Sequence, residues 1–267
     1  MKRNLALVNM FSVLLIIIVS YYAQIIGIND NTIGGLSKEY RNLFTPASYA
    51  FAIWGIIYLA LIIYVVFQID RAFFKDNTVD TSFILQTGPW FFLTNIANAA
   101  WVVAWLYEYT LLSVVLMFFM LVCLIKIILN TNMERWDASF KIIAFTWWPI
   151  CIYAGWISVA TVTNVAAYLV KIGWKGDFLS EETWTVLMIV VVVIINSLII
   201  YKRNMREFAA VAVWGLFAIY IRHMNNSPAI SYVALGGAGL IFSYIAYHGF
   251  VNRKSNPLYK FLYTGEA

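Results

Sequence analysis

Residues 147–164 read WWPICIYAGWISVATVTN, and the architecture expected for the rest of the chain follows from them. The run is apolar and long enough to lie in a bilayer, but its polar groups are poorly suited to face lipid. Trp156, Ala160 and Asn164 recur every four residues, so a helix places them on one stripe. In hydrocarbon the amide of Asn164 needs a hydrogen-bond partner, which predicts that this stripe faces protein or a ligand. Pro149 lacks a backbone N–H and leaves the carbonyl one turn earlier without its usual donor. We therefore predict that this stretch forms one wall of an internal cavity.

The composition is that of a protein embedded in a membrane. The chain has 267 residues, of which 63% are hydrophobic and 12% are charged, whereas soluble domains carry about 25% charged residues. Several apolar runs exceed the ~18 residues that mark a membrane-spanning helix. The formal charge of +5 does not indicate a nucleic-acid partner, because in a membrane protein the placement of Lys and Arg matters more than their sum. We predict an all-α, polytopic membrane protein that has the lipid bilayer as a partner and binds no nucleic acid.

Eight membrane-spanning helices are expected. Their approximate ranges are 5–27, 47–69, 83–107, 110–130, 141–170, 183–201, 207–223 and 228–251. With the N-terminus in the cytoplasm, 13 of the 18 Lys and Arg residues fall in inner segments. This bias supports the helix number and predicts that both termini are cytoplasmic.

The first outer loop, residues 28–45, is the one long loop on the outer side. Its early part contains Asn29, Asp30, Asn31, Gly34 and Gly35, which predicts a series of turns. Because this loop lies above the outer ends of the helices, it is the expected lid of the cavity.

Three of the predicted helices carry aromatic and amide side chains at helical spacing in their outer halves. This arrangement predicts a lidded, aromatic-lined pocket. The candidate residues are Tyr49, Phe51, Trp54 and Tyr58 in the second helix, Asn95, Asn98, Trp101 and Trp105 in the third, and Trp156, Ala160 and Asn164 in the fifth.

Each of these residues also has a structural interpretation. Trp101 and Trp105 lie close enough to the outer end to belong to an interfacial aromatic belt. Asn95, Asn98 and Asn164 could join helices by hydrogen bonds, which are worth about 1 kcal/mol in membranes. Alanine at position 160 could serve close helix packing. The stripes alone predict that aromatic and amide side chains face the interior of the bundle, and they do not distinguish an occupied cavity from simple helix packing.

The same residues carry a family resemblance. Residues 45–58 read TPASYAFAIWGIIY and resemble, with one position fewer between Phe51 and Trp54, the pattern T-P-P-x-W-V-F-G-P-V-W-x-x-L-Y of the TspO/MBR family, the tryptophan-rich sensory and translocator proteins. Pro46, Phe51, Trp54 and Tyr58 are kept, whereas Ala47 and Tyr49 replace a proline and a tryptophan. The family's L-N-x-x-W resembles residues 97–101, and its W-x-x-x-A-T-x-x-N is matched by Trp156, Ala160, Thr161 and Asn164.

The resemblance implies a five-helix TspO-like membrane domain over residues 1–175. Residues 176–267 would then form an additional three-helix membrane segment with a short cytoplasmic tail. It also implies a bound tetrapyrrole such as protoporphyrin IX, or a sterol-like lipid, with a sensory or transport role. The implied ligand-binding residues are Pro46 and the eleven candidates named above.

Other chemistry finds little support in the sequence. His223 and His248 are expected near opposite ends of the bundle, and no Cys/His spacing predicts a metal site. No catalytic residue is expected and no cofactor is required, so an enzyme that modifies a bound pigment or lipid ranks last. The leading interpretation is a binding protein for a small hydrophobic ligand, with a transporter of small hydrophobic molecules as the alternative. A homodimer is a further possible assembly of this chain.

Overall fold

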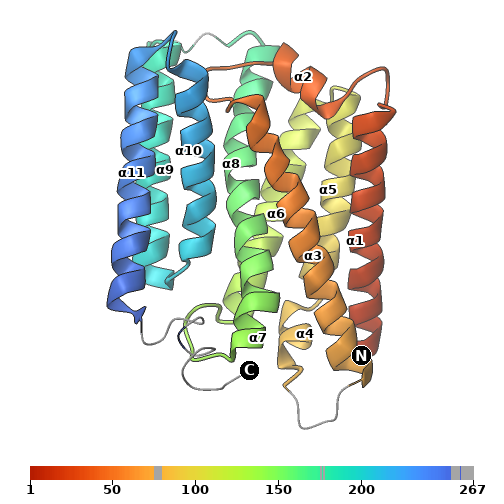
Figure 1. The fold of residues 1–267 in the computed structure, drawn as a ribbon. Helices are drawn as coiled ribbons and strands as arrows, with labels where there is room; N and C mark the ends of the chain where they lie inside the picture. The colour runs from red at the N-terminus through yellow and green to blue at the C-terminus, as the bar shows by residue number, and fades with distance from the viewer. Residues whose placement is uncertain (75–79, 175, 177, 254–258, 260–267) are drawn as a thin grey trace.

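Eight long helices run side by side in the protein (Figure 1). The structure is a computed structural model that describes residues 1–74, 80–174, 176, 178–253 and 259. Within this part of the chain all regular structure is helical, apart from one isolated bridge between Ile28 and Asn31. The long helices are α1 (Lys2–Ile25), α3 (Ile53–Ile69), α5 (Trp90–Leu106), α6 (Thr110–Asn130), α8 (Trp148–Lys171), α9 (Glu181–Arg203), α10 (Arg206–His223) and α11 (Pro228–Val251). The short helices are α2 (Ile33–Glu39), α4 (Ser82–Thr87) and α7 (Phe140–Ile142).

Length and composition support the membrane prediction. Six helical segments of the described residues are long and apolar enough to cross a membrane, and they contain α1, α3, α6, α8, α9 and α11. The other two long helices lie among them, since α5 packs against α1 and α6, and α10 packs against α8, α9 and α11. The predicted all-α, polytopic architecture is confirmed, and each predicted span corresponds to one long helix. Which end of the bundle faces the cytoplasm stays a prediction.

The predicted span 83–107 is broken near its start. Gly88 adopts φ +55° and follows α4, and Pro89 precedes the first residue of α5. A positive φ suits glycine, and proline disfavours the helical conformation at the residue before it, so the helix cannot continue through this dipeptide. The first of the two helices is therefore a separate turn at the end where α1 begins.

The start of α8 shows the effect expected of Pro149. Residues Ile143–Trp147 form a π-helical segment directly before it, and the Trp148 N–H donates to the Ile143 carbonyl five residues earlier. Proline has no backbone N–H and cannot donate a hydrogen bond. The wider π-helical turn before Pro149 lets the backbone hydrogen bonds of the helix continue on both sides of this residue.

The buried apolar residues form two cores. One core joins α1, α3, α5, α6 and α8, and the second joins α9, α10 and α11 together with Phe44 of the first loop. The first core also includes Phe208 and Val211 of α10. An added Cβ at Gly155 of α8 would lie 2.7 Å from the Phe208 carbonyl oxygen, so α8 and α10 are in close backbone contact. The division into two domains at residue 175 stays a prediction.

The first loop contains a helix that the sequence analysis did not predict. The predicted turns are confirmed at Asn29 and Asp30, which adopt φ +54° and +59°. The prediction is wrong for Gly34 and Gly35, which lie in α2. Thr32 caps this helix by accepting a hydrogen bond of 3.1 Å from the Gly35 N–H, and so satisfies one of the backbone donors that have no partner at a helix start. In Figure 1, α2 lies across the end of the bundle opposite to the start of α1.

Candidate ligand-binding site

Aromatic side chains of α3 and α8 meet below α2. The rings of Trp54 and Trp156 are edge to face, with centroids 6.4 Å apart and planes at 88°. Phe51, in the turn that leads into α3, contacts Trp156 in the same way at 6.1 Å, and Tyr58 stacks on Trp54 at 5.4 Å. Offset and edge-to-face contacts are the preferred geometries of aromatic pairs, so this cluster forms a stable wall. On α5, Trp101 and Trp105 are stacked with their planes at 13°.

A hollow with a cavity volume of about 50 Å³ lies between these aromatic residues. We call it the chamber. This volume is below the ~300–1,000 Å³ range of small-molecule sites, so side chains fill most of the space between these helices. It is lined by Ile33, Ser37, Tyr40, Thr45, Pro46, Phe51, Trp54, Trp101, Trp105, Met117, Trp156, Ala160, Thr163, Asn164 and Ala167.

A wider space adjoins the chamber and includes open solvent. We call it the mouth, and its cavity volume is about 680 Å³, within the ~300–1,000 Å³ range of small-molecule sites. Residues of α1 and α2 contribute half of the lining that the chamber lacks. The mouth is lined by Ile17, Ser20, Tyr21, Gln24, Thr32, Ile33, Gly34, Gly35, Ser37, Lys38, Arg41, Thr45, Pro46, Ser48, Phe51, Ala52, Trp54, Tyr58, Asn98, Trp101 and Val102.

Ten of the twelve residues predicted for the site line the chamber or the mouth. The other two do not line either space. Tyr49 is exposed and packs edge to face against Trp214 of α10 at 5.3 Å. Asn95 is fully buried, and its amide donates a hydrogen bond of 3.0 Å to Ser12 Oγ on α1.

The predicted amides join helices. Asn98 Nδ2 donates a hydrogen bond of 2.8 Å to the hydroxyl of Tyr153 on α8. Asn164 Oδ1 accepts from Trp101 Nε1 at 3.3 Å and from Ser113 Oγ of α6 at 3.0 Å. These bonds fix the lateral positions of α5, α6 and α8 around the chamber, which is the structural role considered for both asparagines.

The sequence analysis missed the contribution of α2 to the chamber. Ile33, Ser37 and Tyr40 of this segment all line it. A signal was present, because Ile33, Leu36 and Tyr40 are spaced as one face of a helix and follow the capping residue Thr32. The neighbouring glycines concealed this pattern, since glycine ordinarily disfavours a helix interior.

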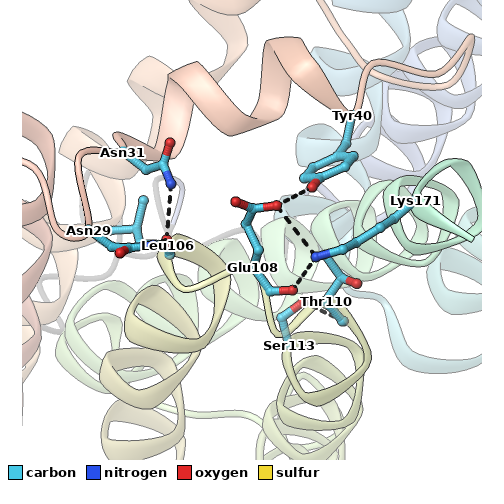
Figure 2. Close-up of polar contacts among 8 residues, drawn as sticks. All are labelled: Asn29, Asn31, Tyr40, Leu106, Glu108, Thr110, Ser113 and Lys171. Carbon is cyan, nitrogen blue, oxygen red and sulfur yellow. Dashed lines mark hydrogen bonds and ion pairs between the residues drawn. The ribbon is translucent and has the colours of Figure 1, made fainter.

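A polar latch holds α2 over the chamber (Figure 2). The hydroxyl of Tyr40 donates a hydrogen bond to the Glu108 carboxylate, and Lys171 Nζ donates to the Glu108 carbonyl at 2.6 Å and forms an ion pair with its carboxylate at 3.5 Å. Beside it, the amides of Asn29 and Asn31 both donate to the Leu106 carbonyl at 3.3 Å. The latch therefore joins the first loop to the short loop between α5 and α6 and to the last turn of α8.

The latch favours the ionised form of Glu108. The hydrogen bond from Tyr40 lowers the pKa of Glu108, and the nearby charge of Lys171 lowers it further. The same hydrogen bond raises the pKa of Tyr40 to about 12. Since the pKa of Glu108 is lower in the folded protein, its contribution is present at neutral pH and is lost as the pH falls through that lowered pKa.

We expect Glu108→Gln to loosen α2. A neutral amide removes the charge from both the Tyr40 and the Lys171 contacts, and charge-assisted hydrogen bonds are the stronger ones. Hydrogen–deuterium exchange of the α2 amides should become roughly 2- to 5-fold faster, in line with the small energies of exposed ion pairs. The control is Glu39→Gln, an exposed carboxylate on the same helix. Equal exchange in both variants would contradict the latch.

Helix α10 anchors the second half of the first loop. Arg222 Nη1 donates to the carbonyls of Asn42, at 2.7 Å, and Thr45, and His223 Nε2 donates to the Leu43 carbonyl at 2.9 Å. The Ala47 N–H donates to the Ala218 carbonyl at 3.1 Å.

The same anchoring continues into the turn before α3. Trp214 Nε1 donates to the Ala50 carbonyl at 3.0 Å, and its ring packs against Tyr49. Because Thr45, Pro46 and Phe51 line the chamber, these contacts of α10 hold part of the chamber wall in place.

Comparison with known proteins agrees with this geometry. A family model described as TSPO-like protein matches residues 6–247, which extend from α1 into α11. No curated protein and no solved structure matches the chain. The match includes the helices that carry the aromatic cluster as well as α9 and α10. The chain belongs to the family of TSPO-like proteins.

Proposed function

We propose that this protein binds a flat, apolar ligand in the space formed by the mouth and the chamber, either a tetrapyrrole such as protoporphyrin IX or a sterol-like lipid, and serves a sensory or transport role. The observation that carries the proposal is the mouth, with a cavity volume of about 680 Å³, together with the adjoining chamber, and the lining of the two includes Trp54, Trp101, Trp105 and Trp156. Aromatic faces favour flat ring systems because offset stacking adds to the free energy of apolar burial.

An unpaired donor in the chamber wall supports a ligand that carries a hydrogen-bond acceptor. Trp156 is 2% exposed, and its Nε1 has no hydrogen-bond partner among the described residues. Leaving a buried donor unsatisfied costs about 1–3 kcal/mol. A bound molecule with a ring nitrogen, carbonyl or hydroxyl near this indole would remove that cost.

Quenching of tryptophan fluorescence tests the proposal. Protoporphyrin IX is titrated into the purified protein in a non-ionic detergent, and we expect saturable quenching with one ligand per chain, since four tryptophans line the chamber. Cholesterol added as a competitor should restore the fluorescence if both ligand classes share the chamber. Quenching that rises linearly with porphyrin and never saturates would indicate partition into detergent and would overturn the proposal.

A further inference from the structure

Titratable side chains from four segments gather where α9 ends and α10 begins, toward the end of the bundle where α1 starts (Figure 1). Glu134 comes from the loop after α6, Arg203 is the last residue of α9, and His248 lies in the last turn of α11. Arg206 and Glu207 are the first two residues of α10. All five residues are partly buried, and we call this group the joint.

Asn204, the residue after α9, fastens the segments of the joint to one another. Its Nδ2 donates a hydrogen bond of 2.9 Å to the Glu134 carbonyl, and its Oδ1 accepts one of 3.1 Å from His248 Nε2. Arg203 Nη2 donates to two further carbonyls at and beyond the end of α6, each at 3.2 Å. The loop after α6 is therefore bound to α9 and α11 through its backbone, which leaves the carboxyl group of Glu134 available for another role.

The joint concentrates buried polar atoms that have no hydrogen-bond partner among the described residues. Five of the thirteen such side-chain atoms belong to it: Glu134 Oε1, Glu207 Oε2, Arg203 Nε, Arg206 Nε and His248 Nδ1. A buried carboxylate without a partner is strongly unfavourable, and a second carboxylate nearby adds repulsion. An arginine cannot respond by losing its proton. The relief must come from a proton taken up by the carboxyl groups.

Glu134 is the carboxyl group that responds. Burial raises its pKa to about 8, the charge of Glu207 contributes to this rise, and the charge of Arg206 opposes it. The other charged or titratable groups around this loop are Arg203, His248, Cys151 of α8, and Arg135 and Asp137 of the loop itself. The last two are exposed, so solvent and salt screen their charges.

We propose that the carboxyl groups of Glu134 and Glu207 form a proton-binding site, and that the bound proton keeps the loop after α6 docked on α9, α10 and α11. With the proton in place, one carboxyl group is neutral and can act as a hydrogen-bond donor. Without it, two carboxylates repel each other across the contact between the loop and α10. The joint is thus a pH-sensitive contact between the first core and the additional helices, and it does not depend on a ligand in the chamber.

The bound proton stabilises the folded protein. The pKa of Glu134 is raised above its ordinary value of 4.5, so between pH 4.5 and about 8 the folded chain binds more protons than the unfolded chain. The stabilisation is complete below this range and is lost as the pH rises through about 8. Glu134→Gln is neutral at every pH and escapes this loss. Its Tm should match that of the wild type near about pH 5 and exceed it by about 2–8 °C near about pH 8.5.

An infrared titration of the purified protein in detergent observes the proton directly, since a protonated carboxyl group and a carboxylate absorb at different frequencies. We expect a carboxyl band that disappears with a midpoint near pH 8 and is missing from Glu134→Gln. Glu207→Gln should keep the band and move its midpoint to lower pH, because the neighbouring negative charge is gone.

The control is Glu181→Gln, an exposed carboxylate at the opposite end of α9, which should titrate like the wild type. A wild-type protein whose carboxyl bands all disappear near pH 4.5 would overturn the proposal. A midpoint that Glu207→Gln leaves in place would also overturn it, because the two carboxyl groups would then not share a site.

Discussion

Replacing Ala160 with phenylalanine is expected to weaken the binding of protoporphyrin IX strongly. Ala160 lines the chamber one helical turn from Trp156 and one from Asn164, so the added ring would project between side chains that already enclose the space. Overfilling a packed site costs typically about 1–3 kcal/mol, and each 1.4 kcal/mol is roughly a tenfold change in affinity. We therefore expect the dissociation constant from fluorescence quenching to rise about 10- to 100-fold.

The control for this variant is Ala246→Phe. Ala246 lies exposed on α11 and lines neither the chamber nor the mouth, so the same substitution there should leave the titration unchanged. Thermal unfolding of both variants checks that each is folded. A quenching curve for Ala160→Phe that overlays the wild-type curve would place the ligand elsewhere.

Periodicity in the sequence was sufficient to place the walls of the chamber. Phe51, Trp54 and Tyr58 share one helical face, as do Trp156, Ala160 and Asn164, and in the structure Tyr58 lines the mouth and the other five line the chamber. The prediction succeeds because a membrane helix that carries its polar groups along one face turns that face toward protein and away from lipid. The family resemblance pointed to the same residues.

The partners of each stripe could not be predicted in this way. Asn98 and Asn164 were candidates for contact with a ligand, and in the structure both hydrogen-bond neighbouring helices. Tyr153, the partner of Asn98, precedes Trp156 by three residues and thus lies on the same face, but periodicity does not say which helix that face meets. Tyr49 illustrates the same limit, because its contact with Trp214 joins segments 165 residues apart.

The latch was beyond prediction for a different reason. Glu108 occupies a three-residue loop and adopts φ +60°, and its role depends on Tyr40 and Lys171, which belong to two other segments. No spacing rule connects these residues. Charged groups in short loops are ordinarily solvated, so the sequence gives no reason to single this one out.

The close contact between α8 and α10 leads to the last expected result: Gly155→Val should destabilise the protein. A Cβ at Gly155 would lie 2.7 Å from the Phe208 carbonyl oxygen and 3.0 Å from Val211 Cβ, and the backbone cannot yield without separating the two helices. Small residues permit such approaches between membrane helices. Overpacking costs about 1–3 kcal/mol, and each kcal/mol lowers the Tm by roughly 2–4 °C in a protein near this size.

A matched glycine separates this contact from the general effect of valine in a helix. Gly236 of α11 has no atom within 4 Å of its added Cβ, so Gly236→Val should leave the Tm unchanged or slightly raised, because glycine is the poorer helix former. Displacement of α10 should also weaken ligand binding, since Arg222 and Trp214 of that helix hold the loop that carries Thr45 and Pro46. Equal Tm values for the two variants would show that α8 and α10 separate at little cost, and the anchoring of the chamber wall by α10 would then have to be abandoned.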